Sequence, residues 1–317
     1  MPQLFALDEK ILFKNKGNDV LAIGELLVDM ITTDEEEIPT YQQFFGGAPA
    51  NIAMNIKKLG IKSLIASAIG EDKIGDFLIN HLKQNEIDIS LVQRVKNATS
   101  MVLLSKSNGT PIPIFYRDAD FSLTFGKALK EAVVDSKIIH FSCWPISRMP
   151  SRSTIEAAIE IAKINDVLIC FDPNYHEMIW QKKEDGIQYV KSIISKSDII
   201  KPSEDDAQRI FGQDTALNQV KKFLDLGAKL VIMTLGEEGL IVSNGQETVK
   251  YATLATEVVD TTGAGDAFWA GFYTALIKGY SIKDAITFGS AASAYKLKYV
   301  GAIVNLPKLE DLKELIK

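Results

Sequence analysis

The chain has 317 residues, of which 46% are hydrophobic and 24% are charged, and its formal net charge at pH 7 is −6. An acidic balance without a basic cluster argues against nucleic acid as a partner. No apolar run approaches the roughly 18 residues that a membrane helix needs, so no membrane partner is expected. The first residues carry scattered charges and no small-residue cleavage pattern, which argues against a secretory signal and predicts a cytoplasmic protein. The expected ligand is a small molecule.

Cysteine and histidine content gives little support to disulfides or zinc. Cys143 and Cys170 lie in apolar runs that are typical of buried strands, so both are expected to be reduced core thiols. The three histidines show no spacing that would complete a structural zinc site.

Two early segments are predicted to form a small sheet apart from the main one. Residues 21–33 (LAIGELLVDMITT) and 100–117 (SMVLLSKSNGTPIPIFYR) have strand-like patterns, a polar turn at Ser107-Asn108-Gly109, and no helix between their halves. No linker or repeat divides the chain. We therefore predict a single domain over residues 1–317, with lid strands within about residues 25–45 and 98–120.

From about residue 137 the chain alternates short β-branched runs with helical periods. The predicted strands are KIIHFS, DVLICFD, DIIKPS and KLVIMTLG. The predicted helices begin near residue 151 and span about 185–195, 204–211, 264–278 and 282–297. Strands separated by helices indicate right-handed βαβ crossovers, and strands that are apolar throughout indicate burial on both faces. The fold class is therefore α/β, with a mainly parallel central sheet.

The stretch EVVDTTGAGDAFWAG at residues 257–271 could carry phosphate chemistry. Gly263 and Gly265 allow a backbone that approaches a ligand closely, and the positive end of the following helix would hold an anion. A carboxylate at Asp266 would then accept the proton of an attacking hydroxyl. The alternative is an ordinary helix cap. The chain contains neither a Walker loop nor a G-x-G-x-x-G fingerprint.

A second stretch, YQQFFGGAPANIAMNIKKLG at residues 41–60, predicts another exposed helix N-terminus. The glycines Gly46 and Gly47 precede a helix that Ala48 and Pro49 open. Asn51, in the first turn, could offer its amide to sugar hydroxyls. The alternative is a plain turn and helix start.

Together, DTTGAGDAF, GGAPANIA and the upstream IGELLVD resemble the ribokinase-like (PfkB-type) family of carbohydrate kinases, over residues 20 to 306. The resemblance implies a three-layer α/β/α sandwich with a small β-sheet lid. It implies Asp266 as general base and the amides of Gly263, Ala264 and Gly265 as an anion hole. Its sugar-binding positions fall on Asp29, Gly46, Gly47, Asn51, Arg117 and Asn174.

The resemblance also implies ATP and Mg²⁺ as cofactors. Its nucleotide positions fall on Lys201, Ser203, Thr234, Gly236 and Gly239. It implies Asp206 as a magnesium contact through water, and a monovalent cation, K⁺, at Asp260, the carbonyl of Thr262 and Gly301. The chain departs from the family pattern in having Ser203 where relatives have Asn, Asp206 where they have Glu, and His176 where they have Arg.

Within the family, Ser203 and the stretches EMIW and FYRDADFSL are most similar to the fructokinase branch. Kinases of 2-keto-3-deoxygluconate are close alternatives, because Arg117 could meet a carboxylate, and ribokinases or nucleoside kinases follow. A phosphorylated acceptor is disfavoured, since no cation lies between residues 34 and 56. The non-enzyme alternative is a silent sugar or nucleotide sensor. The exposed edge of the lid favours a homodimer.

Overall fold

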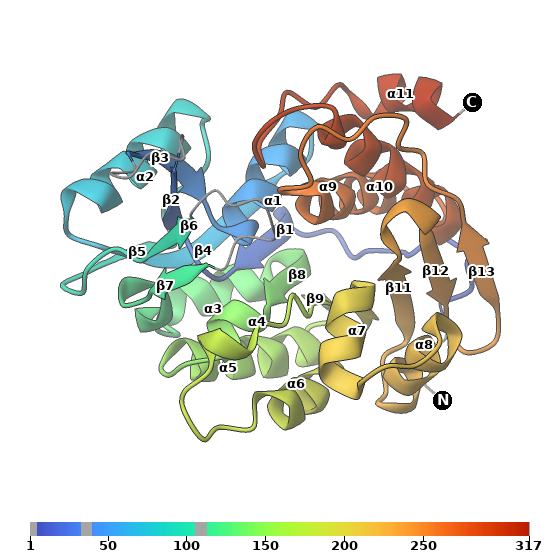
Figure 1. Cartoon of the computed structure of the whole chain (residues 1–317), viewed down its shortest axis with the longest axis horizontal. Coiled ribbons are helices and arrows are strands. Elements are labelled where there is room, and N and C mark those ends of the chain that lie inside the picture. Colours follow the sequence, from blue (N-terminus) through green and yellow to red (C-terminus); the bar gives the residue numbers. More distant parts are fainter. Residues whose placement is uncertain (1–4, 33–39, 105–112, 317) are drawn as a thin grey trace.

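The computed structural model describes residues 5–32, 40–104 and 113–316. Within these residues, nine strands form a central sheet in the order β13-β12-β11-β10-β9-β8-β1-β4-β5 (Figure 1). Every neighbouring pair from β11 to β5 is parallel, and β12 and β13 add an antiparallel edge. The strands are β1 (Asn18–Ile23), β4 (Ser63–Gly70), β5 (Val92–Val95), β8 (Ser136–Ser142), β9 (Leu168–Asp172), β10 (Ile199–Ile200), β11 (Leu230–Thr234), β12 (Leu240–Ser243) and β13 (Thr248–Tyr251).

Successive residues of each strand point to opposite sides of this sheet. Both sets of side chains are apolar, so helices cover both faces. Val20 and Ile138 pack into one hydrophobic core, and their neighbours Leu21 and Ile139 pack into the other. The first core includes residues of α1 (Ala48–Lys58), α9 (Ala264–Ile277), α10 (Ile282–Leu297) and α11 (Leu309–Leu312). The second includes residues of α3 (Lys127–Val134), α4 (Cys143–Ile146), α5 (Ser151–Ile164), α6 (Gly186–Ile194), α7 (Glu204–Phe211) and α8 (Ala216–Asp225). The predicted three-layer sandwich is confirmed.

A smaller sheet, the lid sheet, has the strand order β3-β2-β6-β7. Its strands are β2 (Leu27–Thr32), β3 (Tyr41–Gly46), β6 (Met101–Leu104) and β7 (Ile114–Tyr116). A third core, which contains Val28, Met54 and Leu78, joins this sheet to α1 and to α2 (Lys73–Gln84). The remaining elements are the 3-10 helices η1 (Ala119–Ser122), η2 (Glu177–Ile179), η3 (Gly236–Glu238) and η4 (Lys313–Ile316).

The helices predicted after residue 150 are found within a few residues of their predicted ends. The assignment of all of residues 21–33 to the small sheet is wrong, because β1 lies between β4 and β8 in the central sheet. Leu21, Ala22 and Ile23 are fully buried, as expected for a strand covered on both faces. The predicted turn Ser107-Asn108-Gly109 lies outside the described residues.

In the part of the chain that the structure describes, no helix combines the length and the apolar character needed to cross a membrane.

Candidate active site

The N-terminus of α9 is formed by Gly263, at a position where any other residue would be strained. Gly263 has φ of 75°, in the left-handed region, and a Cβ there would lie 2.6 Å from the Cα of Ala302. Within the part of the chain that the structure describes, no side-chain hydrogen bond caps this helix start. Asp266, in the first turn, therefore does not serve as the side-chain cap that an ordinary helix start would use.

The carboxylate of Asp266 is held by a residue far away in sequence. The Nδ2 of Asn51, on the first turn of α1, donates a hydrogen bond of 2.9 Å to Oδ2 of Asp266. Burial raises the pKa of Asp266 to about 6, and the nearby charge of Asp172 adds to this effect, while Asn51 and Lys201 oppose it. A carboxylate with a pKa near neutrality is suited to accept a proton.

The start of α1 also depends on a glycine. Gly47 is its N-cap, with φ of 115°, and a Cβ there would lie 2.5 Å from the carbonyl oxygen of Glu25. Next to it, a Cβ on Gly46 would lie 2.5 Å from Oδ2 of Asp29, so the absence of a side chain leaves room for that carboxylate. Burial raises the pKa of Asp29 to about 6. A series of neighbouring residues thus connects the lid sheet to Asp266, namely Asp29, Gly46, Gly47 and Asn51.

A lysine that follows β10 lies beside an aspartate at the carboxyl end of β9. Nζ of Lys201 lies 2.9 Å from Oδ2 of Asp172, and the indole Nε1 of Trp269 donates to the same oxygen at 2.8 Å. A Cβ on Gly265 would lie 3.2 Å from Nζ of Lys201. This ammonium therefore lies beside the glycine turn, where an anion would also be held.

The predicted nucleotide residues gather at neighbouring strand ends. A parallel bridge joins Ser203 to Thr234, and the amide of Thr234 donates to the carbonyl of Pro202 at 3.0 Å. Gly236 begins the 3-10 helix η3 and Gly239 follows it, with φ of 56° and 89°. Open α/β sheets bind their ligands outside the carboxyl ends of the strands, and these residues lie at such an edge.

Asp206 is a structural residue in this arrangement. With Ser203 it forms a capping box at the start of α7, and its Oδ2 accepts from the amide (2.9 Å) and hydroxyl (2.7 Å) of Ser203. Its Oδ1 accepts from the amide of Tyr175 at 2.6 Å, and the residue is 4% exposed. Burial raises its pKa. A carboxylate engaged on both oxygens does not fit the part of a direct magnesium ligand.

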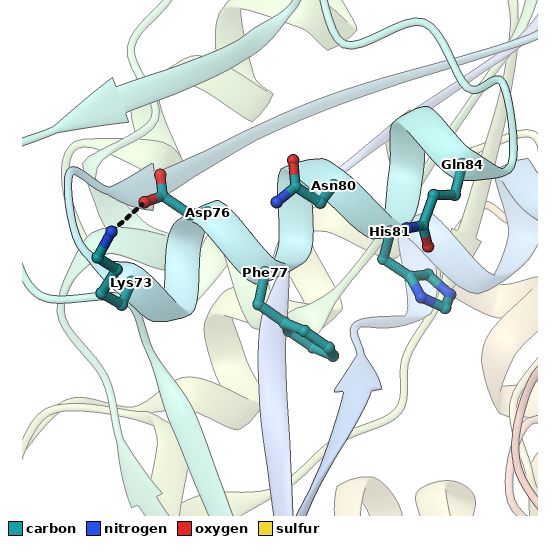
Figure 2. Close-up of a pocket in the computed structure, with 6 residues that line it drawn as sticks. All are labelled: Lys73, Asp76, Phe77, Asn80, His81 and Gln84. Atoms are coloured by element: carbon teal, nitrogen blue, oxygen red, sulfur yellow. Dashed lines mark ion pairs between the residues drawn. The ribbon is translucent and has the colours of Figure 1, made fainter.

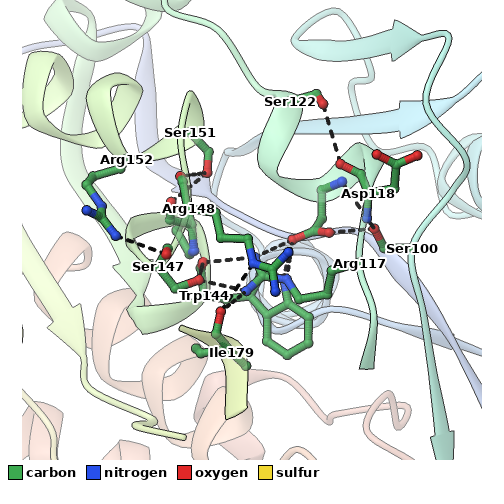
Figure 3. Close-up of polar contacts among 12 residues, drawn as sticks. Ser100, Arg117, Asp118, Ser122, Trp144, Ser147, Arg148, Ser151, Arg152 and Ile179 are labelled. Atoms are coloured by element: carbon green, nitrogen blue, oxygen red, sulfur yellow. Dashed lines mark hydrogen bonds and ion pairs between the residues drawn. The ribbon is translucent and has the colours of Figure 1, made fainter. Parts of the chain in front are cut away.

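Arg117 is buried and fully engaged (Figure 3). Its Nε and Nη2 donate to Oδ2 of Asp120, at 2.9 and 2.5 Å. Its Nη1 donates to the hydroxyl of Ser147 at 2.7 Å. The guanidinium carbon also lies 4.5 Å from the ring centroid of Trp144. Its side chain is only 1% exposed, so Arg117 is a buried residue and not a solvated one. In this structure Arg117 ties the end of β7 to α4.

Two further residues that the sequence singled out follow β9. Asn174 follows β9 with φ of 36°, and the ring of His176 meets that of Phe115, on β7, edge-on at 5.1 Å. Where the family pattern would supply a fixed positive charge, this chain has an aromatic contact to the lid sheet.

Asp260, Thr262 and Gly301, which the sequence predicted to hold a monovalent cation, lie close together. The amides of Thr262 and Gly301 donate to the two carboxylate oxygens of Asp260, at 2.9 and 2.7 Å. A residue that the sequence did not single out, Lys296, also reaches this point, because its Nζ donates to the carbonyl oxygen of Asp260 at 2.5 Å.

Glu25 was also missed, although an acidic residue between two buried strand segments is a usable signal. Its Oε1 accepts from the amide of Ala48 at 3.1 Å, and its Oε2 is buried without a hydrogen-bond partner among the described residues. Burial raises the pKa of this carboxyl to about 8, so it is largely protonated at neutral pH. A neutral Glu25 supports the start of α1 without adding a buried negative charge there.

A separate hollow lies along α2 (Figure 2) and is lined by Lys73, Asp76, Phe77, Asn80, His81 and Gln84. The ring of His81 stacks on Phe45 of β3, with centroids 4.4 Å apart. None of the residues predicted from the sequence lines this hollow. The chemistry described above lies instead at two helix N-termini and at the strand ends.

The chain is similar to known proteins over nearly its whole length. A family model described as pfkB family carbohydrate kinase matches residues 18–309. An ATP-dependent 6-phosphofructokinase of Thermoanaerobacterium thermosaccharolyticum is 58% identical over 315 residues, which cover 98% of each chain.

Two solved structures extend the similarity to three dimensions. A Halothermothrix orenii fructokinase is 40% identical with a TM-score of 0.76, covering 86% of this chain and 97% of its own. A fructokinase double mutant of Vibrio cholerae O395, in a form bound to fructose, ADP and potassium ion, is 25% identical with a TM-score of 0.82, covering 96% of this chain and 100% of its own.

Proposed function

Because the chain belongs to the pfkB family of carbohydrate kinases, we propose that it transfers the γ-phosphoryl group of ATP to a hydroxyl of fructose 6-phosphate. The observation that carries this choice of acceptor is the 58% identity, over 98% of both chains, to an ATP-dependent 6-phosphofructokinase. It revises the preference for free fructose that the sequence motifs alone supported.

Asp266 acts as the general base in this proposal. Its carboxylate is fixed by Asn51 and has a pKa of about 6, because of burial. It is therefore ionised at neutral pH, yet basic enough to take the proton as the sugar oxygen bonds to phosphorus. The proton moves from the acceptor hydroxyl to Asp266, the new oxygen–phosphorus bond forms, and the bond between the γ-phosphorus and the bridging oxygen of ADP breaks.

The turn at residues 263–265 stabilises the negative charge on the transferred group. The amides at the start of α9 and the positive end of that helix offer preorganised donors, and Lys201 adds a cation beside Gly265. Thr234, Gly236 and Gly239 hold the nucleotide at the neighbouring strand end. Asp206 would hold, through a water molecule, the magnesium ion that accompanies ATP, and that ion would supply positive charge to the phosphates.

Free fructose is the second candidate, and one observation favours it. The described acceptor-side residues Asp29, Asn51 and Asn174 carry no positive charge, and the donors of Arg117 are engaged by Asp120, Ser147 and main-chain carbonyls. A sugar phosphate needs a cation for its phosphate group, whereas a neutral ketose needs only hydrogen-bond partners.

Rates of ADP formation with different acceptors test the proposal. Fructose 6-phosphate, fructose, 2-keto-3-deoxygluconate, ribose and adenosine would be compared, with the Asp266→Asn variant as a blank for contaminating kinases. Since a hydrogen bond to a charged group contributes about 1.5 to 3 kcal/mol, even one hydrogen bond to the sugar phosphate predicts kcat/KM at least roughly 10-fold higher for fructose 6-phosphate than for fructose. Equal values, or a preference for fructose, would contradict this choice of acceptor.

We also propose a homodimer formed through the lid sheet. Tyr41 and Phe44 on β3, and Ile114 and Tyr116 on β7, are exposed large apolar residues on the two edge strands of that sheet. Edge strands with exposed apolar side chains are typical of surfaces that pair with another chain.

A further inference from the structure

Lys296 is a lysine with no solvent-exposed surface. It lies in the last turn of α10, and both the residue and its side chain are 0% exposed. Lysine is almost never fully buried unless its ammonium group is paired. Its partner is therefore expected to matter for the fold or for the site.

The partner is the residue that begins the glycine turn. Nζ of Lys296 donates to the carbonyl oxygen of Asp260 at 2.5 Å and lies 3.8 Å from Oδ2 of the same residue. The carboxylate oxygens of Asp260 also accept hydrogen bonds from the amides of Thr262 and Gly301. One buried ammonium is thus paired with Asp260, which belongs to the set of residues that the sequence predicted would hold a monovalent cation.

The same residues connect the ammonium to the anion hole. The main chain before the turn pairs with the end of α10, since the amide of Val259 donates to the carbonyl of Leu297 at 2.7 Å. Thr262 immediately precedes Gly263, whose left-handed conformation begins α9. Anything that fixes Asp260 therefore also fixes the amides that face the transferred phosphate.

A potassium ion does not fit beside this ammonium. Two unit positive charges about 4 Å apart repel by roughly 4 kcal/mol at the effective dielectric typical of protein sites. The carboxylate charge of Asp260 is already matched by Lys296, so a second cation there would have no counter-charge.

We propose that Lys296 is a positioning residue that takes the place of a monovalent cation, so that this kinase orders its anion hole without potassium. The inference rests on the proposed role of the amides at residues 263–265. It also sets the chain apart from the similar Vibrio cholerae fructokinase, which was solved with potassium ion bound.

Cation dependence of the unaltered protein is the first test. Kinase activity and the thermal unfolding midpoint would be measured in potassium chloride and in tetramethylammonium chloride, at one ionic strength of about 0.1 M. We expect kcat to differ by less than about twofold, and the midpoint to be the same, because a cation that does not bind the folded state cannot stabilise it. Activation by potassium of more than about fivefold, or a potassium-specific rise in the midpoint, would overturn the proposal.

Two variants and a control give the second test. Lys296→Met keeps the length of the side chain without its charge, Lys296→Ala leaves a space beside Asp260, and Lys283→Met removes an exposed lysine from the same helix. We expect Lys296→Met to lower kcat at least about tenfold in either salt, since small misplacements of catalytic groups can cost 10²-fold. Nucleotide affinity and the control variant should change little.

Lys296→Ala should respond to potassium, unlike the unaltered protein. We expect potassium, but not tetramethylammonium, to restore part of its kcat and to raise its unfolding midpoint. A folded Lys296→Ala or Lys296→Met protein with normal turnover in tetramethylammonium chloride would refute the proposal. If neither variant folds, the cation dependence of the unaltered protein decides alone. The midpoint needs no sugar, so a wrong acceptor assignment would not be mistaken for a wrong role of Lys296.

Discussion

Replacing Asp266 by asparagine should make the protein more stable and almost inactive at the same time. Burial raises the pKa of this carboxyl from 3.8 to about 6. A carboxyl with a raised pKa in the folded state contributes stability below its unfolded pKa, and that contribution is lost as the pH rises through the folded pKa. At pH 8 the ionised group therefore costs up to about 3 kcal/mol, from roughly two pKa units of 1.36 kcal/mol each.

Asparagine has nearly the same shape and can still accept the hydrogen bond from Asn51, but it carries no charge. The free energy of unfolding of Asp266→Asn at pH 8 should therefore exceed that of the unaltered protein by up to about 3 kcal/mol, and the gain should disappear near pH 3. Since a general base contributes about 10² to 10⁴ in rate, kcat should fall at least roughly 10²-fold. Nucleotide affinity should stay near normal, because Lys201 and the turn amides remain.

Urea unfolding at several pH values, the rate of ADP formation and nucleotide titration would measure the three quantities. Asp205→Asn is a matched control, because Asp205 is an exposed acid in the first turn of α7. Its replacement should leave activity unchanged. Near-normal turnover of Asp266→Asn would refute the role as base, and an unchanged stability at pH 8 would refute the explanation of the raised pKa by burial.

Four other predictions follow from single contacts. Asn51→Ala removes the hydrogen bond that favours ionised Asp266, so the acid limb of the kcat/KM profile should move at least about one pH unit above its position near pH 6. Gly263→Ala should lower kcat more than nucleotide affinity, as its Cβ would lie 2.6 Å from a main-chain Cα of the facing loop. Arg117→Met should cost about 3 to 5 kcal/mol in urea unfolding, since it leaves its buried carboxylate partner unpaired. Tyr116→Glu, at a residue 54% exposed on the lid sheet, should shift the mass measured by light scattering from dimer to monomer without loss of fold. Each of these four predictions is contradicted if the variant gives the same value as the unaltered protein in its assay.

The alternation of elements could be predicted because each element carries its own signal. Apolar strands such as LICFD and LVIMT are recognisable without their neighbours, and Ser203 marks the start of α7 by a local capping box. Residues 21–33 were assigned to one sheet because pattern alone does not say which sheet an apolar strand joins. That choice depends on packing with distant strands, here β4 and β8.

The candidate site was predictable where a motif is local and unpredictable where it depends on distant contacts. The glycine turn and Asp266 lie within a few residues of each other. Lys296, by contrast, is 36 residues from Asp260 and looks like an ordinary solvated helix residue in the sequence. Arg117 also could not be judged from sequence, because its burial depends on Asp120 and Trp144 folding around it.

The most direct test of the central claim is the mass of the sugar after incubation with ATP and fructose 6-phosphate. We predict that the sugar gains one phosphoryl group for each ADP formed, and that Asp266→Asn forms the product at about 1% of that rate or less. ADP formation without a phosphorylated product, or equal product formation by Asp266→Asn, would contradict the account.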